Sequence, residues 1–570
     1  MKRALLLVPV FAAACTAAPP APSVTPRTTD YDVLITGGRI VDGTGAPWFE
    51  GDIGIVGDSI AAMGRLADRT ASTRIDAAGA YVAPGFIDML GQSEFNVLVD
   101  GRAASKITQG ITTEITGEGS SIAPLDDRLA AEAKAQFDSF KVALDFRTLG
   151  EYFERLETRS RPAINIGSFV GAGGVRAYAI GDSQRAATPD ELEQMKTLVR
   201  QAMEQGALGL STSLQYVPDR FAGTDEIVEL AKVAAAYGGR YLTHQRSESS
   251  RIIESLDEAF AVAERAHIPT EVWHLKTAYR ANWGRMPEVL RHFEAARARG
   301  LDVTANMYPY DRASNDLDAC LPLWVREGGT EAMLARLKDP AQRERIKRDM
   351  EDPNPADWEN QWYGSGGADG VLLSSVLDPS LRQWEGKTLA EIGAAMGKDP
   401  RDAAMDLVIA DRGQASVIIS IMREDDVRTA LAHPMVAIGT DSGARAEDGP
   451  LSESKSHPRA WGSFTKILGT YVRDERLIPL EDAVRRFTSR PATRMGIADR
   501  GLLRPGFKAD ITIFDLATVR DRSTFTDPNH YSEGILHVLV NGQAVVSNGA
   551  ITDARPGQVV RGAGYRTSRE

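Results

Sequence analysis

The sequence contains only two cysteines in 570 residues, Cys15 and Cys320. Two cysteines cannot form a disulfide framework, and we expect Cys320 to be a buried apolar residue. The chain also lacks an excess of positive charge, because its net charge is −12 and its isoelectric point is near 5.4. Apart from a short, proline-broken stretch at the N-terminus, it has no apolar run that could cross a bilayer. These absences disfavour nucleic-acid partners and an integral membrane protein.

The first 15 residues have the composition of an export signal. Lys2 and Arg3 precede an apolar stretch, residues 4–14, which ends at Cys15. This order is typical of a bacterial lipoprotein signal, so we expect an exported, periplasmic protein with a lipid anchor on Cys15. Ordinary secretory cleavage is the alternative. Residues 16–30, rich in Ala, Pro and Thr, are expected to form a flexible tether.

The chain as a whole has the composition of a soluble globular protein, with 43% hydrophobic and 25% charged residues. Short β-type runs broken by glycines occur at both ends, in residues 31–82 and 496–570, whereas the region between them alternates strand-like and helix-like segments. We predict an α/β fold: a (β/α)₈ TIM barrel over residues 83–495, with a small β-sandwich domain built from both chain ends. A doubly wound sheet is the alternative.

Eight strand-like runs support the barrel: residues 81–88, 112–116, 163–170, 208–212, 240–244, 270–274, 302–308 and 435–441. The last two are much farther apart than one connecting helix requires. We therefore predict a helical insertion over residues 311–431 that could cover the mouth of the barrel. It contains four tryptophans, Trp324, Trp358, Trp362 and Trp384.

Three polar side chains follow apolar strand runs at the point where each strand ends. These residues are His244, His274 and Asp441. In a (β/α)₈ barrel they would meet at one mouth, where two imidazoles can bind a divalent metal and a carboxylate can transfer a proton. Without the barrel, either histidine would more often be an ordinary core or surface residue.

The motifs around these residues resemble those of the amidohydrolase superfamily, specifically its N-acyl-D-amino-acid deacylase (D-aminoacylase) branch. The resemblance rests on five stretches in matching order and spacing: Thr243-His244-Gln245-Arg246, Trp273-His274-Leu275-Lys276, Tyr308-Pro309-Tyr310, Gly439-Thr440-Asp441-Ser442 and His457-Pro458-Arg459. It implies a metal-bearing (β/α)₈ barrel with a small β domain.

The chain departs from the family pattern at two metal-ligand positions. Where the superfamily has a His-x-His pair after the first strand, this chain has Leu90 and Gln92. Where the branch has a cysteine after the second strand, the nearest substitute is Glu118. The resemblance then implies one Zn²⁺, or another divalent metal, bound by Glu118, His244 and His274. Glu118 could instead be a solvated loop residue or an arginine partner.

The resemblance also implies roles for other residues. Asp441 would act as general base toward water and then as general acid toward the leaving nitrogen, or it could merely cap a helix. Lys276, Tyr216 and Tyr308 or Tyr310 would bind the carboxylate of the amino-acid half, unless the lysine is exposed and the tyrosines are core residues. His457 and Arg459 could contact the substrate.

The sequence thus predicts a metal-dependent hydrolase of linear amide C–N bonds, an N-acyl-(D-)amino-acid deacylase acting on a small-molecule substrate. A dipeptidase, a cyclic amidase or a lactonase on the same scaffold is one alternative. A non-catalytic periplasmic binding protein is the other.

Overall fold

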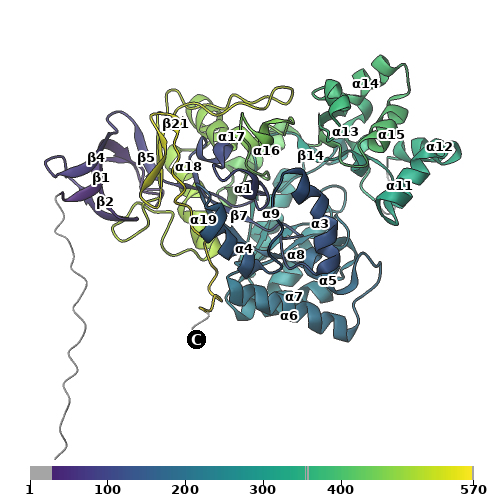
Figure 1. Ribbon diagram of the computed structural model, residues 1–570, viewed down its shortest axis with the longest axis horizontal. Helices are drawn as coiled ribbons and strands as arrows, with labels where there is room; N and C mark the ends of the chain where they lie inside the picture. The colour runs from purple at the N-terminus through teal and green to yellow at the C-terminus, as the bar shows by residue number, and fades with distance from the viewer. Residues whose placement is uncertain (1–28, 354, 356–357, 568–570) are drawn as a thin grey trace, which may run out of the picture.

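We describe the protein from a computed structural model, which covers residues 29–353, 355 and 358–567. The predicted signal and nearly all of the predicted tether lie outside these residues. Figure 1 shows three parts: a β-rich part at one end, a central α/β part, and a group of helices projecting on the opposite side. No helix in the described part of the chain is both long and apolar enough to cross a membrane.

The β-rich part is one nine-stranded sheet to which both ends of the chain contribute. Strand β5 (Tyr81–Pro84) lies between β1 (Tyr31–Ile40) and β18 (Ile511–Phe514), pairing parallel with the first and antiparallel with the second. The other strands are β2 (Phe49–Val56), β3 (Ser59–Gly64), β4 (Ala71–Asp76), β19 (Ile535–Val540), β20 (Gln543–Ser547) and β21 (Ala550–Ile551). Isoleucines of these strands, with Val82 and Leu539, form most of a separate apolar core.

The α/β part is built on parallel strands. One group is β6-β7-β8 and the other is β17-β13-β12-β11-β10-β9. The strands are β6 (Phe86–Asp88), β7 (Ile111–Thr116), β8 (Asn165–Ser168), β9 (Val170–Gly171), β10 (Gly209–Ser213), β11 (Arg240–His244), β12 (Thr270–Val272), β13 (Val303–Met307) and β17 (Val436–Ile438). Their side chains are almost wholly buried, as expected for parallel strands covered by helices on the outside.

Helices alternate with these strands along the chain. The helices that follow strands in this way include α3 (Asp127–Ser139), α4 (Leu149–Arg155), α5 (Ala172–Ile180), α6 (Pro189–Gln205), α7 (Thr224–Ala236), α8 (Ile252–Ala266), α9 (Met286–Ala298), α16 (Glu424–Ala432), α18 (Leu480–Phe487) and α19 (Ser489–Met495). Helix α6 has a capping box at Thr188 and Pro189 in its first turn, so the sequence itself fixes where the helix starts.

The run predicted as one strand over residues 81–88 is divided into two strands of different sheets. The break is at Gly85, where a Cβ atom would lie 2.2 Å from Thr112 Oγ1. This close approach requires glycine, and the chain passes there from the β-rich part into the α/β part.

The insertion over residues 311–431 is not purely helical, which corrects the prediction. It contains a three-stranded antiparallel sheet of β14 (Ala313–Asp316), β16 (Ser416–Ile419) and β15 (Val371–Ser375). Apolar runs of four or five residues are too short to separate a strand from a helix by periodicity. Helices α11 (Gly329–Lys338), α12 (Pro340–Met350), α13 (Gln361–Ser365), α14 (Leu389–Met396) and α15 (Pro400–Ala410) form the projecting group (Figure 1).

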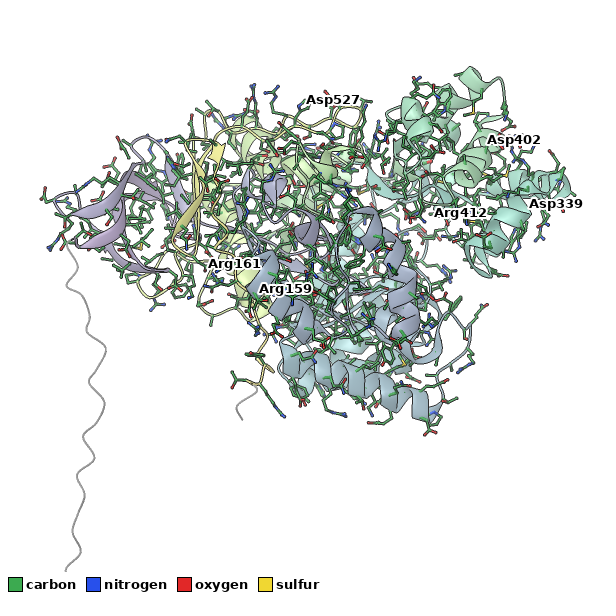
Figure 2. All side chains as sticks on the ribbon, in the orientation of Figure 1. Arg159, Arg161, Asp339, Asp402, Arg412 and Asp527 are labelled. Carbon is green, nitrogen blue, oxygen red and sulfur yellow. The ribbon has the colours of Figure 1, made fainter. Side chains whose placement is uncertain are left out.

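Asp339, Asp402 and Arg412 are charged residues of this helical group (Figure 2). Asp339 caps helix α12 by accepting backbone hydrogen bonds from Ala341 and Gln342. Asp402 joins helices α12 and α15 through an ion pair with Arg343 at 2.9 Å. Such partly exposed pairs add little stability, and the apolar contacts beneath them hold the insertion together.

Candidate metal centre

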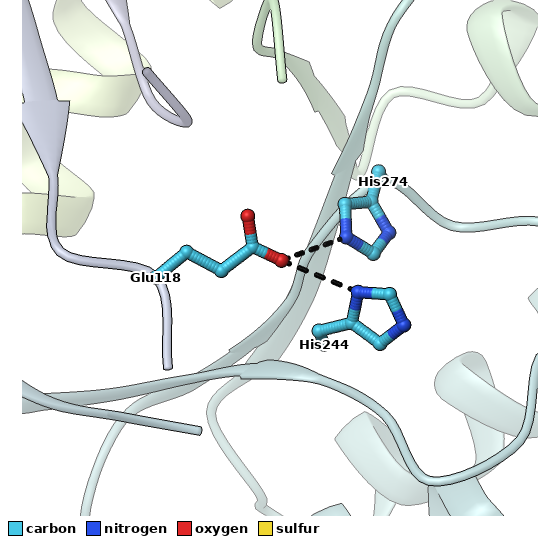
Figure 3. A group of neighbouring side chains, drawn as sticks. All are labelled: Glu118, His244 and His274. Atoms are coloured by element: carbon cyan, nitrogen blue, oxygen red, sulfur yellow. Dashed lines mark hydrogen bonds and ion pairs between the residues drawn. The ribbon is translucent and has the colours of Figure 1, made fainter. Parts of the chain in front are cut away.

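Three potential metal ligands converge at the carboxyl ends of the parallel strands. His244 ends β11, His274 follows β12 by two residues, and Glu118 lies in the loop after β7. One ligand atom from each side chain lies within 4.8 Å of the others, and this is the single such group of three found in the described residues. Figure 3 shows one carboxylate oxygen of Glu118 facing both imidazoles.

The two distances from the Glu118 oxygen to the imidazole nitrogens are close to the ligand spacing around a tetrahedral ion. Glu118 Oε1 is 3.2 Å from His244 Nδ1 and 3.2 Å from His274 Nε2. Zinc–nitrogen and zinc–oxygen bonds of about 2.0–2.2 Å give a tetrahedron whose edges are roughly 3.3–3.6 Å. The donor set, two imidazoles and one carboxylate, is also one that catalytic zinc uses, with a further position left for water.

The charges around the cluster favour a cation. Burial alone would raise the pKa of Glu118, but the hydrogen bonds with His244 and His274 hold it well below its usual range. Burial and Lys276 oppose protonation of His274, yet the carboxylates of Asp441, Glu248 and Glu118 together raise its pKa to about 9. Three carboxylates surround this one imidazole. A bound divalent ion would neutralise part of their negative charge.

A second carboxylate, Glu248, orients His274 from behind. Glu248 Oε1 lies 2.9 Å from His274 Nδ1 and 2.8 Å from Lys276 Nζ. When Nδ1 donates its proton to this carboxylate, the lone pair of Nε2 is directed toward Glu118, which is the tautomer that a metal requires. Burial would raise the pKa of Glu248, but Lys276 keeps it well below the usual value. The sequence analysis did not identify Glu248.

Lys276 and His274 are both buried and in close contact, with Nζ 2.6 Å from Nδ1. A charged ammonium can only donate, so this contact competes with donation from Nδ1 to Glu248 for the same nitrogen. The sequence analysis assigned Lys276 to the substrate carboxylate, whereas its ammonium already pairs with Glu248. It still lines the pocket, so it can interact with a substrate as well as with Glu248.

Asp441 stands beside the cluster, three residues after β17. Its carboxylate forms an ion pair with Arg459 at 2.6 Å, and its backbone N–H donates to Leu90 O at 2.7 Å. Asp441 and His274 both have positive φ angles, +50° and +35°. Residues other than glycine adopt this conformation at some energetic cost, and such strain is often found at functional sites.

Gln92 bridges Asp441 and the metal cluster. Its side-chain nitrogen lies 2.9 Å from Glu118 Oε2 and 3.0 Å from Asp441 Oδ1. Both partners are carboxylates and can only accept, so the amide must present its NH₂ group to them. The amide hydrogens therefore occupy the space between the two carboxylates. Leu90, at the other position where the superfamily has histidine, is buried and offers no ligand atom.

A buried lysine supports the strand ends beneath the cluster. Lys106 Nζ lies 2.8 Å from Asp88 Oδ2 and 2.7 Å from Thr440 Oγ1, and its side chain has no exposed surface. Glu114 lies 3.6 Å away. Asp88 ends β6 and Glu114 belongs to β7, so this one ammonium links two strands to the loop that carries Asp441.

The cluster opens into a pocket of about 520 Å³, which is large enough for a small ligand. Its lining includes Gln92, Glu94, Glu118, Ser213, Gln215, Tyr216, His244, Glu248, His274, Lys276, Tyr279, Ser314, Asp316, Gln361, Ser416, Asp441 and Arg459. Ser314, Asp316, Gln361 and Ser416 come from the insertion, which therefore forms part of the pocket wall.

The predicted substrate-binding residues are divided between the pocket and its surroundings. Tyr216 lines the pocket, with its ring 5.1 Å from that of His244. Tyr308 is buried between Lys276 and Arg459, with both cations over its ring, and it does not line the pocket. Tyr310 points elsewhere, toward Asp521 and the Pro458 carbonyl.

His457 also lies outside this pocket. Its Nε2 faces the Arg312 carbonyl at 3.0 Å, and its Nδ1 accepts from the Arg459 N–H at 3.0 Å. Burial holds its pKa well below the usual value, so His457 is neutral. Both ring nitrogens are used in positioning the segment that carries Arg459, and neither is available for a metal.

Comparison with known proteins finds relatives that agree with the family suggested by the motifs. A family model described as "Amidohydrolase family" matches residues 368–546. The D-aminoacylase of Alcaligenes xylosoxydans xylosoxydans is 34% identical over 534 residues, which are 93% of this chain and 97% of that protein. The N-acyl-D-glutamate deacylase of the same organism is 34% identical over 93% of this chain and 96% of its own.

Solved structures similar to this chain belong to the same group of deacylases. The crystal structure of N-acyl-D-glutamate deacylase from Bordetella bronchiseptica, complexed with zinc and a phosphonate inhibitor, has a TM-score of 0.76, 34% identity and coverage of 93% of this chain and 99% of that chain. A D-aminoacylase structure described in terms of its binuclear metal center, with one-metal activation and second-metal attenuation, has a TM-score of 0.76 and 33% identity, covering 93% and 99%. The resemblance inferred from the motifs is confirmed: this chain belongs to the amidohydrolase superfamily, in its D-aminoacylase branch.

Proposed function

We infer that the protein is a metal-dependent hydrolase that removes the acyl group from N-acyl-D-amino acids by cleaving the linear amide C–N bond. The observation that carries this proposal is the convergence of Glu118, His244 and His274 next to Asp441, in a pocket of small-molecule size. Its relatives are D-aminoacylase and N-acyl-D-glutamate deacylase by name, which supports the D configuration. The dipeptidase, cyclic-amidase, lactonase and non-catalytic alternatives have no comparable support.

The proposal includes a closed (β/α)₈ barrel as the scaffold. β8 and β9 are separated only by Phe169, which would make the two parallel groups continuous. A bridge between Gly91 and Ser442 connects the segments after β6 and β17, the two outer strands. Side chains from four strands, Ile87, Ile115, Leu242 and Ala437, belong to one apolar cluster, as expected inside a barrel. Residues 85–495 would be the barrel with its insertion, and residues 31–84 and 496–567 the β domain, so the boundary predicted at residue 83 moves to Gly85.

Glu118, His244 and His274 would hold one ion, and zinc suits this donor set. A bound zinc supplies Lewis-acid polarisation of the amide carbonyl and lowers the pKa of an attacking water. Asp441 would accept the proton of that water and deliver it to the leaving nitrogen. Arg459, paired with Asp441, would orient the carboxylate, while Glu248 fixes the ring of His274.

One ion, rather than two, is proposed because of Gln92. Its amide hydrogens point into the region between Glu118 and Asp441, where they would repel a second cation. Leu90 adds no ligand there.

The substrate carboxylate would bind on the cationic side of the pocket. Lys276 and Arg459 provide the positive charge, and Tyr216 provides a hydrogen-bond donor, while the buried ring of Tyr308 supports both cations from behind. Holding the carboxylate there would align the amide with the metal and Asp441. The proposal also includes export to the periplasm, with a lipid anchor on Cys15.

The test is a hydrolysis assay with purified protein on N-acetyl-D-amino acids, their L enantiomers, dipeptides, cyclic amides and lactones. We expect turnover of the N-acetyl-D-amino acids, loss of activity after chelation, and recovery on adding zinc. Preference for another class would replace the proposed substrate. No turnover in any class, with less than about a tenth of a metal ion per chain, would favour a binding protein.

A further inference from the structure

A second cavity of about 240 Å³ adjoins the metal pocket. The two cavities share five lining residues: Gln92, Ser314, Ser416, Asp441 and Arg459. The second cavity therefore lies directly on the other side of the Asp441–Arg459 pair. The rest of its lining is polar, consisting of Asn96, Ser374, Ser375, Ser442, Gly443, Arg445, Lys455, Ser456 and His457.

Positive charge predominates in this lining. Arg445, Lys455 and Arg459 are cationic, whereas Asp441 is the one carboxylate, and Arg459 already pairs with it at 2.6 Å. Lys455 donates to the Thr526 carbonyl at 2.9 Å and lies within electrostatic range of two carboxylates outside the cavity, those of Glu385 and Asp527. The cation that is least compensated is therefore Arg445.

Arg445 is half-buried, and it differs from the buried arginines of the protein in lacking a carboxylate partner. Arg176, Arg486 and Arg500 each form an ion pair with a carboxylate, those of Glu226, Asp482 and Asp510. Arg445 has no ion pair with any described residue, and its Nε is buried without a hydrogen-bond partner among them. Burial is the one cause found for its lowered pKa, so no nearby carboxylate offsets the desolvation.

A guanidinium removed from water normally has an anionic partner, because its hydrogen-bond donors and its charge both need one. Arg445 faces a cavity with six serines and an asparagine, which can donate further hydrogen bonds to an oxyanion. A carboxylate is the anion that fits the proposed chemistry, since every substrate of this site would carry at least one.

We propose that this cavity binds a second carboxylate of the substrate, with Arg445 as the residue that recognises it. This inference rests on the proposed function and specifies the substrate class as N-acyl-D-amino acids with two carboxylates. The second carboxylate could come from the amino-acid side chain, as in N-acetyl-D-glutamate, or from the far end of a dicarboxylic acyl group, as in N-succinyl-D-alanine. The two are distinguished by assay.

The test compares substrates that differ only in this charge. The pairs are N-acetyl-D-glutamate with N-acetyl-D-glutamine, and N-succinyl-D-alanine with N-butanoyl-D-alanine. We expect the wild type to prefer the diacid of one pair by at least tenfold in kcat/KM, and that pair identifies the source of the carboxylate. Arg445→Gln should reduce the preference at least tenfold, mainly through KM, and Arg445→Lys should restore part of it. Arg412→Gln, on the exposed side of the insertion, is the matched control.

A preference that is absent from both pairs, or that Arg445→Gln leaves unchanged, would overturn the proposal. Should Arg445→Gln fail to fold, Ser375→Glu gives the same test, because a carboxylate placed in the cavity should abolish the diacid preference. If it does not, the proposal is equally overturned.

A binding measurement separates this inference from the proposed function. Glutarate should raise the melting temperature of the wild type in a saturable manner and should have no effect on Arg445→Gln. An enzyme inactive on every N-acyl-D-amino acid that still responds to glutarate in this way would retain the subsite while losing the proposed function. No saturable response of the wild type would overturn the subsite, whatever the activity.

Discussion

Glu118 is the residue on which the metal centre depends most. It is the one ligand whose oxygen contacts both imidazoles, and its loop has no second acidic residue close enough to join the group of three. Where the D-aminoacylase branch has a cysteine, a carboxylate takes its place. Both are anionic ligands of zinc, so the substitution preserves the charge of the site.

We predict that Glu118→Gln removes the metal, because an amide oxygen is a neutral and weaker ligand. Metal content should fall below about a tenth of an ion per chain, and kcat/KM should fall by about 100-fold or more. Glu118→Cys should keep the ion, since thiolate is a preferred zinc ligand. Elemental analysis and steady-state kinetics measure both, with the exposed Glu132→Gln as control. A metal-loaded and active Glu118→Gln enzyme would contradict the assignment.

Gln92 provides the second residue-scale prediction. Gln92→Glu replaces two amide hydrogens with a third carboxylate beside Glu118 and Asp441, and three carboxylates can bind a cation. In excess zinc the variant should hold about two ions per chain, against about one for the wild type. A wild type that takes up two ions, or a variant limited to one, would refute the role given to Gln92.

Two of the candidate ligands, His244 and His274, could be predicted from sequence because each follows an apolar strand run, whereas Glu118 was indicated only by the family resemblance. Their positions at strand ends, together with the family motifs, were sufficient to identify both histidines. Glu248 could not be predicted, since its approach to His274 depends on how the loop after β11 folds, closed by the hydrogen bond from Ala278 N to Glu248 O. The ion pair of Arg459 with Asp441 likewise depends on the path of a long loop.

At the scale of elements, the buried Lys106 joins strands β6 and β7 to the segment that carries Asp441. A charge with no exposed surface is stable only with its partners in place. Lys106 lies in helix α2 (Ala104–Ile107), which has only four residues. The contacts of its ammonium with Asp88 and Glu114, rather than the stability of so short a helix, therefore hold the lysine in place.

Lys106→Met should therefore destabilise the protein by about 3–5 kcal/mol, because it leaves Asp88 and Glu114 buried without a cation. Chemical denaturation followed by circular dichroism measures this. The control is Lys134→Met, which breaks an exposed pair with Asp138 on helix α3 and should change stability by less than about 0.5 kcal/mol. Equal stability of the two variants would show that the Lys106 cluster carries no such energy.

The turn after β10 provides a pH-dependent prediction. Asp219 accepts the backbone N–H of Ser213 at the end of this strand, and burial raises its pKa to about 7. The folded protein then retains a proton that the unfolded chain loses near pH 4. The free energy of unfolding should consequently fall as pH rises from about 4 to about 7, by about 2–4 kcal/mol from this group.

Asp219→Asn should remove that slope while keeping an acceptor for Ser213. Its melting temperature relative to the wild type should rise between pH 5 and pH 8. A difference between the two proteins that is constant with pH would contradict the raised pKa.

Most elements of the α/β part could be predicted from periodicity, and the strand predicted over residues 240–244 has those bounds in the structure. Two features could not. The division of residues 81–88 between two sheets at Gly85 could not be predicted from the run itself. The requirement for glycine there comes from the close approach of Thr112, which is distant in the sequence. The short strands β15 and β16 obtain their stability from pairing with each other inside the insertion.

At the scale of the whole molecule, the two chain ends meet in one sheet. Pairing of β5 with β18 joins residues separated by more than 400 positions, so the β domain can be completed only after the rest of the chain has been made. Strand β1 begins at Tyr31. In the proposed arrangement, the predicted tether over residues 16–30 would connect this sheet to the lipid anchor on Cys15.

Export and anchoring are tested by Cys15→Ala. Fractionation of cells that make the wild type should recover the protein with the membranes, whereas the variant should lose its membrane association because it lacks the acceptor for lipid. The catalytic properties of the released domain should not change, since Cys15 lies outside the described fold. Wild-type protein found free in the periplasm would instead support ordinary secretory cleavage.

The central claim is that one cation is bound by Glu118, His244 and His274. The most direct measurement is anomalous scattering at the zinc edge from crystals of the purified protein. We expect one peak per chain, about 2.0–2.2 Å from Glu118 Oε1, His244 Nδ1 and His274 Nε2. Two peaks, or none within bonding distance of these three atoms, would contradict the account.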